Sequence, residues 1–181
     1  MSGKQYYLIA QLPDITNAER TLPVTESYYR DVCARFLSAK QLEVLAMLSL
    51  VPPRTAVPTG SQFLDAWYEH ERNLRFALAQ IRAQKMKRDA EQVPSSCTQD
   101  IVAAARTAVG MDSPLSAEQF LHEYRMSVLN SMRPLDMFSI DAVYEYGIRL
   151  LLVQRMKKFN KETGTVSYHR IYDSILENSN D

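Results

Sequence analysis

Hydrophobic and polar residues alternate with helical periodicity along most of this chain, most clearly between Ser61 and Asp89, a stretch without Gly or Pro. At 100° per residue, the pattern of an amphipathic helix places large apolar residues on one arc: Phe63, Leu64, Trp67, Tyr68, Leu74, Leu78, Ile81 and Met86. Polar residues, including Asn73, fall on the opposite side. Glu71, Arg75 and Arg82 instead project into the apolar arc. We therefore expect a long helix over 61–89 with an ionic cluster in or beside its buried face.

Shorter helical patterns lie on both sides of this stretch, and Pro or Gly ends most of them. They predict helices over residues 25–37, 38–51, 98–110, 116–132, 139–163 and 165–177. Ser116 opens the fourth with a capping box, although Ser113 is a possible alternative cap. Residues 5–12 fit a strand or a helix equally well. Because only these first residues could form β structure, the predicted fold class is all-α.

Two segments rich in turn-forming residues divide the predicted helices. Residues 52–60, PPRTAVPTG, form the clearest linker, and residues 90–97 form a second. We expect an N-terminal helical segment at 1–51, the linker at 52–60 and a helical bundle at 61–181, folded as one unit. A 61–89 helix would span about 43 Å, whereas a compact chain of this length has a radius of gyration of about 16 Å. An elongated multi-helix bundle organised on one long central helix is therefore predicted.

The composition narrows the classes of function. Lys and Arg together number 21, as do Asp and Glu, so the formal net charge is zero. General nucleic-acid binders and membrane-surface proteins usually carry a basic excess, so neither class is indicated. Two cysteines are too few for a disulfide scaffold and favour a reduced intracellular setting. No apolar run approaches the roughly 18 residues of a membrane span, so we expect a cytoplasmic protein that meets a membrane only through partners.

The sequence contains no recognisable catalytic set. The three histidines do not share a helical face at i,i+4 spacing, and neither a Gly-rich phosphate loop nor a nucleophile elbow is present. Glu118 and His122 could supply two metal ligands, which is fewer than a metal site requires. We therefore predict a protein that is not an enzyme, with no catalytic residue, no metal and no cofactor.

The ionic residues on the apolar faces allow two interpretations. Arg125 lies next to the apolar stripe of the 116–132 helix, and Glu71 and Arg75 have the i,i+4 spacing of an ion pair. Because buried arginine is rare unless paired, the favoured interpretation is a structural ion network of Glu71, Arg75, Arg82 and Arg125 that fixes helix register. The alternative is a pocket in which these arginines bind an anion or an acidic group of a partner.

Aromatic residues outside the predicted core are candidates for partner contacts. Phe76 lies on the polar side of the 61–89 helix, which suggests a second packing surface. Tyr6 and Tyr7, near the N-terminus, are further candidates.

Three stretches carry a family resemblance. They are QYYLIAQLPDI at 5–15, FLDAWYEHERNLRFALAQIRAQKM at 63–86, and the pair SPLSAEQFLHEYRMSVLNSM and MFSIDAVYEYGIRLLLVQRMKKFNKETG at 113–132 and 137–164. In this order they resemble a small bacterial family of unknown function encoded within V-type ATPase operons. The matching positions include the four ionic residues named above. Met126 stands where the family is expected to have an aromatic residue.

This family distantly resembles the C-type subunit of V/A-type ATPases (the d-type subunit of eukaryotic enzymes), an all-helical funnel that seats the rotor shaft on the membrane ring. The resemblance implies a non-catalytic coupling or accessory subunit of a bacterial V-type ATPase. Its partners would be the central stalk and the membrane ring, and it would lie at the cytoplasmic side of the inner membrane through that complex. Two alternatives are an assembly factor for the enzyme and a small-molecule or anion-binding helical protein using the Arg/Glu pocket.

Overall fold

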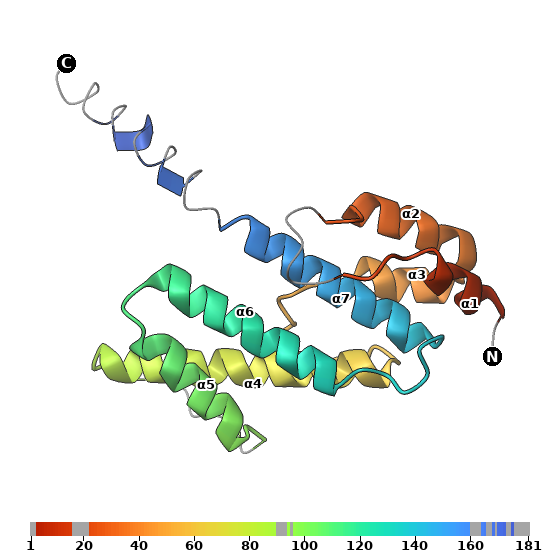
Figure 1. The fold of residues 1–181 in the computed structure, drawn as a ribbon. Coiled ribbons are helices and arrows are strands. Elements are labelled where there is room, and N and C mark those ends of the chain that lie inside the picture. Colours follow the sequence, from red (N-terminus) through yellow and green to blue (C-terminus); the bar gives the residue numbers. More distant parts are fainter. Residues whose placement is uncertain are drawn as a thin grey trace.

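The computed structural model describes residues 3–15, 22–89, 94 and 96–159, together with 164, 165, 168, 170–172 and 175 near the C-terminus. Across these residues the regular secondary structure is helical, without a strand, which confirms the all-α prediction. The helices are α1 (Gly3–Ala10), α2 (Glu26–Phe36), α3 (Ala39–Ala46), α4 (Gln62–Lys85), α5 (Gln99–Gly110), α6 (Pro114–Ser131) and α7 (Ile140–Lys157) (Figure 1). No described helix is long and apolar enough to cross a membrane.

Several helix boundaries differ from the predicted ones. Residues 5–10 of the ambiguous 5–12 segment belong to α1, and α3 ends at Ala46 rather than Val51. The chain leaves α3 early because Leu48 is buried in the core and the Ser49 N–H donates to the Tyr68 hydroxyl at 3.3 Å. Helix α6 begins at Pro114 with Ser113 as its cap, so Ser116 lies inside the helix instead of opening it.

Helix α4 ends at Lys85, four residues before the predicted end of the 61–89 helix. Lys87 has a φ of 52°, the left-handed conformation that usually favours glycine after a helix. The Arg88 N–H bonds the Ala83 carbonyl at 2.9 Å and the Lys87 N–H bonds that of Gln84 at 3.1 Å, the two bonds of a Schellman motif. With Lys in place of Gly, the sequence carries no stop signal here. Met86, expected on the apolar arc, is therefore 57% exposed.

Some predicted segments fall partly outside the described residues. The predicted linker at 90–97 is described only at residues 94, 96 and 97. Helix α7 ends at Lys157, and residues 160–163 of its predicted extension lie outside the description. Within the predicted 165–177 helix, the described positions are helical.

Packing is shared between two helices rather than organised on α4 alone. With 24 residues, α4 is the longest of the helices named above, and its main packing partners are α5 and α7. Helix α7 packs mainly against α1, α2, α4 and α6. In Figure 1, α1–α3 gather beside α7 at one end, and α5 crosses the other end of α4. The prediction of one long central helix that organises the bundle is therefore not confirmed.

The N-termini of α4 and α7 are joined by a hydrogen bond between the cap of α4, Ser61, and Asp141 in the first turn of α7. Ser61 accepts a bond from the Leu64 N–H at 3.2 Å and donates its hydroxyl to Asp141 at 2.6 Å. The same carboxylate accepts the Phe63 N–H at 3.4 Å. An aspartate in the first turn of α7 thus also satisfies the free amide groups at the start of α4, which links the two helices at a fixed position.

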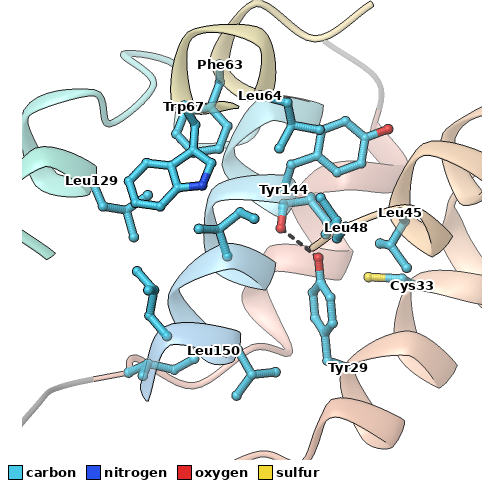
Figure 2. Packing of buried hydrophobic residues seen from close by; sticks show 14 of the residues in the cluster. Tyr29, Cys33, Leu45, Leu48, Phe63, Leu64, Trp67, Leu129, Tyr144 and Leu150 are labelled. Atoms are coloured by element: carbon cyan, nitrogen blue, oxygen red, sulfur yellow. Dashed lines mark hydrogen bonds between the residues drawn. The ribbon is translucent and has the colours of Figure 1, made fainter. Parts of the chain in front are cut away.

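The buried apolar residues form two hydrophobic cores. The larger core combines α1–α3 with the first half of α4, the second half of α6, and α7. It includes residues from both the 1–51 and 61–181 segments, such as Cys33, Leu45, Trp67 and Tyr144 (Figure 2). The smaller core joins the second half of α4 to α5 and the first half of α6.

Gly147 permits a close contact within the larger core. A Cβ atom at this position would lie 2.7 Å from the Tyr29 hydroxyl and 2.8 Å from Leu48. The Tyr29 hydroxyl lies in the space left by the missing side chain of Gly147. It donates to the Val143 carbonyl at 2.8 Å, the bond drawn in Figure 2. The close approach is therefore made by a tyrosine and a leucine side chain, and it joins α2 and α3 to α7.

Candidate functional site

A buried ion pair connects α4 to α6. The Arg125 guanidinium faces the Glu71 carboxylate side-on, with Nε 2.9 Å from Oε2 and Nη2 2.8 Å from Oε1. Glu71 is 1% exposed and Arg125 is 5% exposed. Two parallel charge-assisted bonds are the strongest arrangement available to these groups, and they suit two ions held away from water.

Arg75 adds a second guanidinium to the same carboxylate. Its Nε donates to Glu71 Oε1 at 3.0 Å, and its Nη2 donates to the Leu50 carbonyl at 3.1 Å. The side chain remains 39% exposed, so this half of the cluster faces solvent. Through this contact, the ion cluster also holds the segment that leads into the 52–60 linker.

The structure brings together three of the four predicted ionic residues and leaves Arg82 out. Arg82 is exposed near the end of α4 and forms no ion pair with the described residues. The helical wheel placed it on the apolar arc, but the smaller core does not extend to its side of the helix. A pocket built by Arg82, Arg75 and Arg125 is therefore not formed, because Arg125 is buried and paired with Glu71.

The ion pair lies where the two cores meet. Along α4, Glu71 stands between Tyr68 of the larger core and Leu74 of the smaller one. Along α6, Arg125 stands between Leu121 of the smaller core and residues of the larger core. An ion pair at this point cannot be satisfied if α4 slides against α6, so it specifies their register.

Further polar and titratable groups lie beside the ion cluster. The Tyr124 hydroxyl donates to Asp100 at 3.1 Å, and the His70 ring packs 5.7 Å from the Tyr124 ring. Burial lowers the pKa of His70 and raises the pKa of Cys97, which disfavours both the imidazolium and the thiolate. Among the described residues, no three His, Cys, Asp or Glu side chains are placed to hold a metal ion.

An exposed aromatic patch lies where α1 approaches the loop between α6 and α7. We define it as Tyr6, Tyr7 and Phe138. The Tyr6 and Phe138 ring centroids are 4.9 Å apart, and those of Tyr6 and Tyr7 are 5.8 Å apart. Tyr6 is 53% exposed and Tyr7 is 63% exposed, and exposed Leu135 and Met137 come from the same loop as Phe138. The sequence singled out the two tyrosines but gave no indication that the 135–138 loop would join them.

The second feature that sequence patterns missed is a cleft beside Phe76. This side chain is partly buried and lines a hollow of about 590 Å³ between α4 and the 52–60 linker. Arg54, Arg72 and Arg75 line the same hollow. The residues come from a helix and a linker whose contact no periodicity predicts.

Comparison with known proteins adds no family or function: no protein-family model, no curated protein and no solved structure matches the chain.

Proposed function

We propose that the protein is a non-catalytic helical adaptor that binds other protein subunits, and that its complex is a bacterial V-type rotary ATPase. In this role it would connect the central stalk to the membrane ring. The specific complex rests on the resemblance of the three sequence stretches, and the adaptor role rests on the surface of the described residues.

The observation that carries the adaptor role is the aromatic patch. Rings as large as tyrosine and phenylalanine combine a wide apolar face with a polar tip, and they are enriched where proteins meet. Here two of them remain more than half exposed although the same chain buries Tyr29 and Tyr68 almost completely. An exposed group of aromatic and aliphatic residues is best accounted for by a partner that covers it.

The ion cluster supports a structural rather than a catalytic role for the interior. Its carboxylate is shared by two guanidinium groups and is closed to solvent on the Arg125 side. Such a group is neutralised within the molecule and fixes helix register, which a rigid adaptor requires.

Affinity purification of the tagged chain from its own cells tests the proposal. The tagged protein should recover V-type ATPase subunits in fixed proportion. A variant with Tyr6→Ser and Tyr7→Ser should lose them while keeping its melting temperature, because both side chains are exposed. The matched control is Tyr28→Ser, which removes a 47% exposed tyrosine from α2 and should retain the subunits.

Each outcome of this purification has a defined meaning. Recovery of no ATPase subunit from membranes that contain the intact enzyme would contradict the proposal. Equal loss in the Tyr28 variant would show that the patch is not the contact. A chain that binds assembly intermediates but is absent from the finished enzyme would identify an assembly factor instead of a subunit.

A further inference from the structure

Among the residues that the structure describes, the cleft beside Phe76 is lined by more positive than negative charges. Arg54, Arg72 and Arg75 line it, against a single lining carboxylate from Asp89. Neither Arg54 nor Arg72 forms an ion pair with any described residue. Arg75 shares its carboxylate with Arg125, so that cluster also keeps one surplus positive charge.

Arg75 is held in a defined orientation with one nitrogen to spare. Its Nε and Nη2 are fixed by Glu71 and the Leu50 carbonyl, whereas its Nη1 makes no hydrogen bond within the described part of the chain. A guanidinium nitrogen of this kind keeps two donors for a ligand. Because its orientation is already set, little conformational entropy is lost when a ligand binds.

Apart from Gln80, the remaining lining residues of the cleft are apolar. Phe76, Ala79 and Ala83 lie along one side of α4, and Pro52 closes the linker side. At about 590 Å³, the cleft has the volume of a small-molecule site. Guanidinium groups next to an aromatic ring match a ligand that has an anionic group on an apolar body.

We propose that this arginine cleft binds an oxyanion, either a carboxylate or a phosphate, carried on an apolar body that packs against Phe76. The oxyanion meets Arg72, Arg54 and the free Nη1 of Arg75. Such a ligand could be a small phosphorylated molecule or an acidic side chain of a partner protein, and the two share this chemistry. The proposal does not depend on the ATPase assignment.

A titration followed by backbone amide NMR shifts tests this proposal on the full chain. The probes are phenyl phosphate, phenylacetate, inorganic phosphate, acetate and benzyl alcohol. The two ring-bearing anions should shift the amides of Arg54, Arg72 and Phe76. They should bind at least about tenfold more tightly than the bare anions, which lack the ring, or the neutral alcohol, which lacks the charge. A tenfold difference in affinity corresponds to about 1.4 kcal/mol.

Two variants assign the binding to the cleft. Replacing Arg54 and Arg72 together with Gln should weaken phenyl phosphate and phenylacetate by about tenfold or more, since each charge-assisted bond contributes about 1.5–3 kcal/mol. Arg35→Gln, which removes one exposed arginine from α2, is the matched control and should bind as the parent does. Circular dichroism confirms that both variants stay folded.

Three results would overturn the proposal. The first is the absence of any amide shift with either ring-bearing anion at about 10 mM, since a dissociation constant of that size corresponds to only about 2.7 kcal/mol. The second is that benzyl alcohol binds as tightly as the ring-bearing anions. The third is that the Arg35 variant loses as much affinity as the variant lacking Arg54 and Arg72. A preference for phenyl phosphate would support a small phosphorylated ligand, and a preference for phenylacetate would support an acidic side chain. Failure of this titration would leave the affinity purification above unaffected, so the two proposals are tested separately.

Discussion

Replacing Glu71 with Leu removes the carboxylate that neutralises Arg125 inside the protein. The guanidinium it leaves behind belongs to a residue that is 5% exposed, so water cannot take the place of the carboxylate without opening the junction between the cores. Breaking a buried ion pair from one side costs about 3–5 kcal/mol, because an uncompensated charge stays in a medium of low polarity. We therefore expect Glu71→Leu to be among the most destabilising single substitutions in this chain.

The size of the effect can be converted into a melting temperature. For a chain of this length, a loss of about 1 kcal/mol in unfolding free energy lowers the melting temperature by about 2–4 °C. Glu71→Leu should therefore lower the melting temperature by on the order of 10 °C. Arg75→Leu is the matched comparison. It breaks a pair whose arginine side chain is 39% exposed, and such pairs contribute about 0–1 kcal/mol.

A double-mutant cycle separates the ion pair from simple loss of packing. Glu71→Leu combined with Arg125→Met removes both charges, and replacing a whole buried pair with apolar residues is often neutral or stabilising by about 1–4 kcal/mol. Urea unfolding gives the unfolding free energy of Glu71→Leu, of Arg125→Met and of the double variant. It can be followed by the fluorescence of Trp67, a residue that is 1% exposed. The double variant should be more stable than Glu71→Leu alone.

Two results would refute this reasoning. If Glu71→Leu lowered the unfolding free energy by less than about 1 kcal/mol, the pair would behave as a surface ion pair. If the double variant lost the sum of the two single effects, no coupling would exist between the charges. Either result would mean that burial of the pair does not determine the register of α4 and α6.

Four further substitutions test other parts of the structure. Gly147→Ala should lower the unfolding free energy by about 1–3 kcal/mol in chemical denaturation, because its Cβ would lie 2.7 Å from the Tyr29 hydroxyl; Gly110→Ala, with no atom within 4 Å of the added Cβ, should be neutral or stabilising. Lys87→Gly should raise the midpoint slightly, since the left-handed conformation costs a non-glycine residue about 1 kcal/mol. Burial lowers the pKa of His70 from its ordinary 6.5, so the unfolded chain binds the proton first and stability should fall as the pH drops below 6.5. His70→Phe should reduce that slope in unfolding curves measured across this pH range.

Periodicity predicted the fold class and much of the interior because a helix buries residues at regular spacing. Trp67 and Leu74 are buried as the 100° spacing requires, and Glu71 was correctly placed among them. Periodicity cannot say which part of an apolar arc a neighbouring helix will cover. For this reason Arg82 lay on the predicted apolar arc but is exposed. Asn73, assigned to the polar side, is buried because it meets Ser96 after α4.

The candidate surfaces were less predictable than the core. The aromatic patch needs the 135–138 loop to approach α1, and the arginine cleft needs the 52–60 linker to fold along α4. Both are contacts between residues far apart in the chain that carry no local signature. The sequence supplied Tyr6, Tyr7 and Phe76 as candidates, but the partners Phe138, Arg54 and Arg72 became visible only in three dimensions.

The position of the ion pair between two cores also has a mechanical consequence. Helix α5 packs mainly on α4 and α6, and both of these helices continue into the larger core. A load applied at α5 would therefore reach α7 through both α4 and α6. The ion pair between Glu71 and Arg125 would resist sliding of one of these helices along the other. We expect α4 to slide along α6 more easily when either charge is removed, because the remaining charge is left without its partner.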